Sequence, residues 1–274
     1  MKEKMPSETG QELADVQSYE DTRNLAIDEV GITDVPYPIK FASNSESEET
    51  PQSTVGKFDM LVSLPSTSKG THMSRFIQTL RDHERLLSYE SLAELCVKLR
   101  HRVTADWASI CVNFPYFIER QAPVSGESGL LQLDVTLNAT AGKNQDLKVT
   151  VAGPAMSLCP CSKEIAEYGA HNQRCLLSAS IRFHNIAHSV SVSELFQHME
   201  QAASASVYST LKRNDEKYVT ELSYDNPKFV EDTVRDLALR LKSCDRISWF
   251  RCSTKNFESI HQHNAFAQIE SKPN

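Results

Sequence analysis

Residues 130–139, LLQLDVTLNA, alternate apolar and polar side chains along most of their length. Leu131, Leu133, Val135 and Leu137 fall on one face, and polar residues separate them. A period of two residues is typical of a strand with one face in the core, and a clean alternation favours an antiparallel sheet. This stretch therefore predicts a half-buried antiparallel strand.

Working outward from this strand, the same order of elements occurs twice in the chain. Further strands are predicted at residues 55–64, 107–117, 147–152, 176–183, 247–252 and 265–269. Helices are predicted from about 71 to 80, from Ser91 with Glu94 in a capping box, from Ser191 to about 211, and from Asn226 and Pro227 onward. Residues 212–221 are interpreted as a solvated connection. The sequence predicts an α+β fold of two antiparallel sheets, each with a helix pair.

Three regions are predicted along the chain. Residues 1–53 form an N-terminal arm and flexible linker, in which residues 1–20 are disordered, 22–40 pack on the body and 43–54 form a mobile acidic loop. Residues 54–144 form a first module. Residues 145–274 form a second module, which carries most of the chemistry.

The composition is that of a globular protein, with 274 residues, 40% hydrophobic and 24% charged. No apolar run reaches the roughly 20 residues needed to cross a bilayer, and residues 1–17 lack the apolar core of a secretory signal. We therefore expect a cytoplasmic protein without a membrane partner. Its seven cysteines are then expected to be reduced thiols.

The net charge of −7 argues against a general nucleic-acid partner, because such binding depends on clustered basic residues. It does not exclude a small phosphate-bearing ligand, which needs only a local basic pocket. The candidates for such a pocket are Lys69, Arg75, Lys163, Arg174, Lys212 and Arg213.

The most reactive stretch is MSLCPCSKEIAEYGAHNQR, residues 156–174. Cys159 and Cys161 flank Pro160, and the residues after them predict a short helix that Gly169 can end. A thiol at a helix N-terminus loses its proton more readily, so it can act as a nucleophile, an acid/base or a metal ligand. The alternatives are a disulfide or two inert buried cysteines.

A metal site is the second reading of this stretch. Cys159 and His171, with His261 or His263 and a carboxylate, supply the mixed sulfur, nitrogen and oxygen donors that suit zinc or iron. Such a site polarises water, which favours hydrolysis at an electrophilic carbon. A structural zinc site would more often show paired CxxC motifs, which this chain lacks.

Several long motifs resemble one family. They are SLPSTSKGTHMSRF, SLCPCSKEIAEYGAHNQR, DEKYVTE, YDNPKFVEDTVRD and NFESIHQHNAFA, with DVQS and DEVGI near the start. Together they resemble the type IB family of GTP cyclohydrolase I over residues 15–269. The resemblance implies the tunnelling fold, with two tandem modules per chain, and a homotetramer with active sites at subunit interfaces.

The resemblance also implies a reaction, in which GTP and water give formate and 7,8-dihydroneopterin triphosphate, the first step of folate and pterin biosynthesis. Water activated by one divalent metal per subunit, Zn, Mn or Fe(II), attacks guanine C8. The implied metal ligands are Cys159, His171, Glu216 and His261. The implied catalytic residues are Cys161 as general acid/base, Glu231 and His263 in proton transfers, and His72 from a neighbouring subunit. Glu258 is implied to bind the guanine edge, with Lys163, Arg213 and Lys69 as candidate phosphate contacts.

Other functions are open at this point. The related archaeal-type enzyme opens the same ring and ends in a 2′,3′-cyclic phosphate. A non-catalytic purine-binding protein of the same fold is a second alternative. A thiol oxidoreductase is disfavoured, because the two cysteines are spaced as CxC rather than CxxC and the histidines would have no role.

Overall fold

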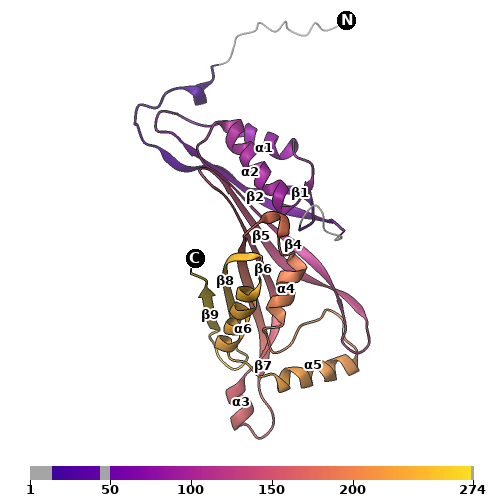
Figure 1. Cartoon of the computed structure of the whole chain (residues 1–274). Helices are drawn as coiled ribbons and strands as arrows, with labels where there is room; N and C mark the ends of the chain where they lie inside the picture. Colours follow the sequence, from indigo (N-terminus) through magenta and orange to yellow (C-terminus); the bar gives the residue numbers. More distant parts are fainter. Residues whose placement is uncertain (1–13, 44–49, 273–274) are drawn as a thin grey trace, which may run out of the picture.

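The computed structural model describes residues 14–43 and 50–272, and one nine-stranded sheet runs through them (Figure 1). The strand order is β3-β1-β2-β4-β5-β6-β7-β8-β9. All neighbouring pairs are antiparallel except the short β1–β3 pair, which is parallel. The strands are β1 Ile27–Phe41, β2 Gln52–Leu64, β3 Leu86–Leu87, β4 Ala108–Gln121, β5 Ser128–Ala141, β6 Gln145–Leu158, β7 Asn172–Phe183, β8 Ile247–Asn256 and β9 Ala265–Glu270.

Six α-helices accompany the sheet in the described ranges. They are α1 Ser74–Arg81, α2 Tyr89–Val103, α3 Pro160–Ile165, α4 Val192–Glu200, α5 Arg213–Asp225 and α6 Val230–Ser243. Two 3-10 turns lie at Val16–Ser18 and Ile186–His188. None of these helices combines the length and the apolar character needed to cross a bilayer.

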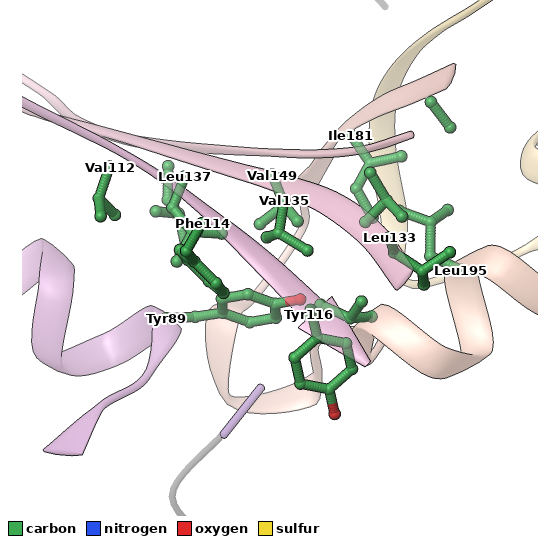
Figure 2. Packing of buried hydrophobic residues seen from close by; sticks show 14 of the residues in the cluster. Tyr89, Val112, Phe114, Tyr116, Leu133, Val135, Leu137, Val149, Ile181 and Leu195 are labelled. Atoms are coloured by element: carbon green, nitrogen blue, oxygen red, sulfur yellow. The ribbon is translucent and has the colours of Figure 1, made fainter. Parts of the chain in front are cut away.

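The strand predicted from residues 130–139 is confirmed as β5, in the middle of the sheet. Its odd-numbered residues from 131 to 141 are buried, and the residues between them are partly or fully exposed. Figure 2 shows Leu133, Val135 and Leu137 on the same side of the sheet as Tyr89 and Leu195. Burying one such side chain stabilises the fold by about 1.5–3 kcal/mol. The face of β5 that carries the apolar residues is therefore the face that packs into the core.

Each half of the sheet carries helices, as predicted. α1 packs against α2, and α2 contacts β4 and β5, whereas α4 contacts β6 and β7 and α6 contacts β8 and β9. The predicted apolar stripe of α2, made of Leu92, Leu95, Cys96 and Leu99, is fully buried. The α+β class is therefore confirmed. The prediction of two separate sheets is wrong, because β5 pairs with β6 and joins the two halves into one sheet. A module boundary at residue 145 stays a prediction.

Gly153 brings α4 close to β6, the strand that leads into the reactive cysteines. A Cβ at this position of β6 would lie 2.3 Å from Cε2 of Phe196 and 2.6 Å from Cδ2 of Leu133. Only a residue without a side chain therefore permits this contact between helix and sheet. The packing anchors β6 six residues before Cys159.

The N-terminal arm differs from the prediction. Residues 27–41 form a strand that pairs with β2 from Ile27 to Phe41, with register shifts between Ile27 and Val30 and between Ile32 and Val35. Joining the sheet buries the apolar face that includes Ile39 and Phe41. The expected disorder of residues 1–20 and mobility of residues 43–54 fall partly on residues 1–13 and 44–49, which lie outside the described ranges. In the described parts both expectations are wrong, because Val16–Ser18 form a 3-10 turn and residues 52–54 pair with β1 as the start of β2.

The start of α2 was also placed wrongly. The N-cap is Ser88 rather than Ser91, and the two serines form the capping box with each other. The Ser88 hydroxyl accepts from the Ser91 amide at 3.2 Å, and the Ser91 hydroxyl accepts from the Ser88 amide at 2.7 Å. The usual capping-box motif has Glu or Gln at the third helical position. Ser91 occupies that position here, so that motif did not identify Ser88 as the N-cap.

The second helix pair required a larger correction. Ser191 caps α4 as predicted, but α4 ends at Glu200 rather than near residue 211. The chain leaves the helix there to bond with β6, because the Ser204 amide donates to the Met156 carbonyl and the Met156 amide to the Ala205 carbonyl. Residues 212–221, expected to be a connection, belong to α5.

Asn226 does not open a helix. It occupies the C-cap position of α5, and α6 begins three residues later than Pro227, with Phe229 as its N-cap. The Asn226 side chain instead donates to the carbonyl oxygens of Ala203 and Ser204. Local capping rules could not anticipate this acceptor pair, which comes from a segment 22 residues earlier.

Candidate active site

The reactive cysteines lie where β6 ends. Cys159 is the N-cap of α3, and Pro160 occupies the first helical position. Proline is tolerated there because the first N–H of a helix has no intrahelical acceptor. The Cys159 sulfur accepts from the Ser162 amide at 3.5 Å. The short helix predicted after the cysteines is confirmed, although it ends at Ile165, and Gly169 adopts its positive φ of 115° in the loop beyond.

Ser162 joins Cys159 to His171 across the α3 loop. Its hydroxyl donates to the Cys159 carbonyl at 3.1 Å and accepts from the His171 amide at 3.2 Å. The Cys159 amide also donates to the His171 carbonyl at 3.2 Å. Two of the predicted metal ligands are therefore held side by side by backbone and hydroxyl hydrogen bonds.

The His171 ring is held by side chains from two further elements. Its Nδ1 lies 2.9 Å from Oε1 of Gln173 and 3.3 Å from Oγ of Ser259. An amide oxygen only accepts hydrogen bonds, so in the neutral ring Nδ1 carries the hydrogen and Nε2 keeps its lone pair. A neutral imidazole in this tautomer is suited to bind a metal through Nε2.

The loop between β8 and β9 brings the second group of predicted residues to the same end of the sheet. Glu258 is half-buried, and His261 and His263 are exposed. The two histidine rings stack with centroids 5.1 Å apart, so they face the same way. Ser259 contacts His171, so this loop lies against the α3 turn.

The helices α5 and α6 meet near the cysteine turn as well. The Lys228 amide donates to the Leu158 carbonyl at 3.1 Å, directly before Cys159. Glu231 lies exposed in the first turn of α6, three residues further on. Lys163 reaches the end of α5, where its Nζ donates to the Tyr224 carbonyl at 2.6 Å and lies 4.2 Å from the Tyr224 ring centre.

Two predicted residues lie at the other end of α5. Glu216 and Arg213 sit in its first turns, where Asp215 binds the β4–β5 loop through the amides of Val124 and Ser125. Eight residues separate Glu216 from Tyr224, which is roughly 12 Å along a helix. Within one chain Glu216 thus lies at the opposite end of α5 from the Lys163 contact, and among the described residues it forms no metal-holding group with Cys159 and His171.

Lys69 and His72 lie still further away. His72 lines a cavity of about 510 Å³ beside the end of β2, and its Nε2 is 3.3 Å from Asp15 Oδ2. Through β4 and β5 this end of β2 joins the Gln145 end of β6. Because β6 has 14 residues, its two ends are roughly 43 Å apart, with Cys159 beyond the far one.

The donor set for a metal is incomplete in one chain. Among residues 14–43 and 50–272, no group of three or more His, Cys, Asp or Glu side chains is arranged to hold an ion. Cys159 and His171 fit two positions of a zinc or iron site, with a thiolate and an oriented imidazole. His261 lies on the neighbouring loop, and Glu216 is distant.

The pairing and burial of the cysteines bear on the alternatives given for Cys159 and Cys161. All seven cysteines are unpaired, so the disulfide alternative for Cys159 and Cys161 is wrong. Cys161 is exposed and Cys159 half-buried, which also contradicts the alternative of two inert buried thiols. Burial instead raises the pKa of Cys96 on α2 and of Cys175 on β7 to about 12.

The residues that hold the site together were not singled out from the sequence. Ser162, Gln173 and Ser259 each lie within two residues of a predicted site residue, in the runs CPCS, HNQR and ESIH. Polar residues next to a metal ligand are candidates for orienting it, and that signal was present. Which of them point inward depends on how α3 and the β8–β9 loop fold back.

Comparison with known proteins matches the chain to one family over most of its length. The model of the family described as type I GTP cyclohydrolase folE2 matches residues 13–267. The chain is 47% identical over 259 residues to GTP cyclohydrolase FolE2 of Magnetococcus marinus, covering 94% of this chain and 96% of that protein. It is 43% identical over 261 residues to GTP cyclohydrolase FolE2 of Syntrophotalea carbinolica, covering 95% and 96%.

A solved structure is similar in fold alone. The uricase of Arthrobacter globiformis superposes with a TM-score of 0.52 at 9% identity, over 89% of this chain and 92% of that one. At this identity the likeness extends to the large antiparallel sheet and its helices, and it carries no argument about chemistry.

Proposed function

The chain belongs to the type I GTP cyclohydrolase FolE2 family, and from this premise we propose that the α3 turn and the β8–β9 loop together form its active site. The family assignment confirms the tunnelling fold and makes the protein a GTP cyclohydrolase, which converts GTP and water to 7,8-dihydroneopterin triphosphate and formate. The observation that supports the location is the contact of Ser259 with His171, since it joins the loop of Glu258 to the cysteine turn.

The roles of the site residues follow from their placement. Cys161 is exposed beside Cys159, so its sulfur can exchange a proton with solvent and with a ring nitrogen of the guanine. Glu258 is half-buried, and an ionised carboxylate can accept the ring N–H and the exocyclic amine of guanine together. Glu231 and the exposed His263 are proposed to assist the proton transfers.

The proposed metal site uses Cys159 and His171 as its fixed members. His261 and Glu216 are proposed to complete the set, with zinc, manganese and ferrous iron as candidate ions. A bound divalent ion would lower the pKa of a water molecule and make hydroxide available near neutral pH. Glu216 must then come from another copy of the chain or through a shift of α5.

We propose that the enzyme is a homotetramer with active sites at subunit interfaces. The distance of roughly 43 Å along β6 separates His72 and Lys69 from Cys159 in one chain, so these two residues would serve a neighbouring subunit's site. Ile165 and Tyr168 beside α3 are 82% and 98% exposed. Such apolar side chains at the rim of a site favour contact with a partner.

The phosphate contacts are proposed as Lys163, Arg213 and Lys69. Lys163 must release the Tyr224 carbonyl to reach a triphosphate, whereas Arg213 and Lys69 are exposed. We place the enzyme in the cytoplasm, at the entry to folate and pterin synthesis.

The test is a GTP assay on purified protein reconstituted without oxygen with zinc, manganese or ferrous iron. We expect formate and a product that becomes a fluorescent pterin after oxidation, with a linear rather than cyclic phosphate chain. Absence of both products with every metal would refute the enzyme assignment. A cyclic phosphate would indicate the archaeal-type reaction, which the relatives do not favour.

Two variants separate the roles of the cysteines. Cys161→Ala should abolish turnover while the metal content per subunit is retained. Cys159→Ala should lose metal as well as turnover. Cys244→Ala is the matched control, because Cys244 is a free, half-buried thiol at the end of α6. Loss of metal from Cys161→Ala would show that the two roles are exchanged.

A further inference from the structure

Gln173 has a side chain that the proposed mechanism does not use. It lies at the start of β7, paired in register with Ser157 of β6, and only 9% of it is exposed. Its Oε1 is 2.9 Å from His171 Nδ1 and 3.4 Å from the Ser259 hydroxyl. The Ser259 hydroxyl is 3.3 Å from the same Nδ1, so the three polar atoms form a closed triangle.

The triangle constrains the His171 ring. A neutral histidine can carry its hydrogen on either nitrogen, and the two forms offer the lone pair in different directions. An acceptor fixed at 2.9 Å selects the form with hydrogen on Nδ1. Gln173 cannot turn away easily, because a buried amide that loses its partner costs about 1–3 kcal/mol.

The same oxygen also holds the β8–β9 loop. Ser259 is adjacent to Glu258, and the described loop residues 257–264 have no regular secondary structure of their own. Among the hydrogen bonds of the described residues, those of Ser259 to His171 and Gln173 are side-chain links from this loop to β7. Holding Ser259 therefore restricts where the Glu258 carboxylate lies.

We propose that Gln173 is a positioning residue that sets the His171 tautomer and, through Ser259, docks the loop that binds the guanine. The inference rests on the proposed function for the role of Glu258, whereas the tautomer of His171 can be tested without any reaction. One acceptor oxygen thus couples the orientation of a metal ligand to the position of a substrate carboxylate.

The variants differ in whether they keep the acceptor. Gln173→Met has nearly the same size but no oxygen, and Gln173→Glu restores a carboxyl oxygen at the same place. Ser259→Ala removes only the link to the loop. Gln268→Met is the matched control, because Gln268 is an exposed residue of β9. Gln173→Asn, with a shorter polar side chain, serves as a second test if Gln173→Met does not fold.

The first measurement is nitrogen NMR of the metal-free full chain labelled in its histidines, at roughly pH 9, where an ordinary imidazole is neutral. His171 should show hydrogen on Nδ1 in the wild-type protein, in Gln173→Glu and in Ser259→Ala. In Gln173→Met it should show the other tautomer or an average of both. An unchanged Nδ1–H signal in Gln173→Met or Gln173→Asn would overturn the proposal.

The second measurement is steady-state kinetics with GTP and chelator competition for the bound metal. Gln173→Met should weaken metal binding or turnover by roughly 10–100-fold, as is usual for a partner of a metal-binding histidine. Ser259→Ala should raise KM with little change in kcat, and Gln173→Glu should recover most of the loss. Equal kinetics in Gln173→Met and the wild type would contradict the proposal. An inactive wild-type protein would refute the proposed function, and the NMR result would still decide the role of Gln173.

Discussion

Replacing Asn226 with alanine should destabilise the protein and misplace the cysteine turn. The Nδ2 of Asn226 donates to the Ala203 carbonyl at 3.1 Å and to the Ser204 carbonyl at 3.0 Å. Both acceptors belong to residues that are at most 3% exposed. Alanine would leave two buried carbonyl oxygens without this donor.

The magnitude follows from those two oxygens. An unsatisfied buried acceptor costs about 1–3 kcal/mol, and water can reach part of the gap because Asn226 is only half-buried. We expect the free energy of unfolding to fall by about 2–4 kcal/mol. The effect should extend to catalysis, since the Ser204 hydroxyl accepts from the amide of Leu158 at 3.1 Å, next to Cys159.

The assay is urea unfolding at one fixed protein concentration, because assembly adds to apparent stability. Asn214→Ala is the matched control, since Asn214 lies exposed on α5. It should change the free energy of unfolding by no more than about 0.5 kcal/mol, as is usual for a surface position. A similarly small change in Asn226→Ala would refute the reasoning, as would an unaltered kcat in a clearly destabilised variant.

Three further predictions concern charge and burial. Arg120→Met should lower the free energy of unfolding by about 3 kcal/mol, because it leaves the Glu200 carboxylate, 7% exposed, without its ion-pair partner. The double variant Arg120→Met/Glu200→Leu should regain most of this loss in urea unfolding. Equal losses in the single and double variants would contradict the prediction. Burial alone would raise the pKa of Asp215, but hydrogen bonds from the Ser125 side chain and from backbone amides lower it below the ordinary value of 3.8. The ionised Asp215 carboxylate therefore stabilises the fold above about pH 4, and this contribution is lost as the pH falls further. The Tm difference between wild type and Asp215→Asn should shrink below that pH. A Tm difference that does not change with pH would contradict the prediction. Iodoacetamide at pH 8 should label Cys161 in the native protein, and mass spectrometry would show the labelled sites. It should not label the buried thiols whose pKa burial raises to about 11 or 12, which are Cys96, Cys175 and Cys252.

The sequence predicted the sheet and most of its helix faces because their signals are local. Alternation in β5 and the apolar stripe of α2 each report burial within one element. The predictions were wrong where hydrogen bonds to a segment distant in the sequence replaced the bonds that local capping and helix rules predict. Residues 201–205 do not continue α4, because their backbone forms hydrogen bonds with Met156 of β6. Asn226 donates hydrogen bonds to this segment instead of capping α6.

The same division holds for the site. Motif spacing singled out Cys159, Cys161 and His171 as candidate site residues, because they lie in one continuous stretch of the chain. The family supplies the reaction. Sequence could not show that Gln173 and Ser259 meet at His171, since that contact depends on β8 lying beside β7. Nor could it show that Glu216 and His72 lie far from Cys159 within one chain. Those distances are set by the length of α5 and β6 and by the pairing of strands, which only the tertiary structure decides.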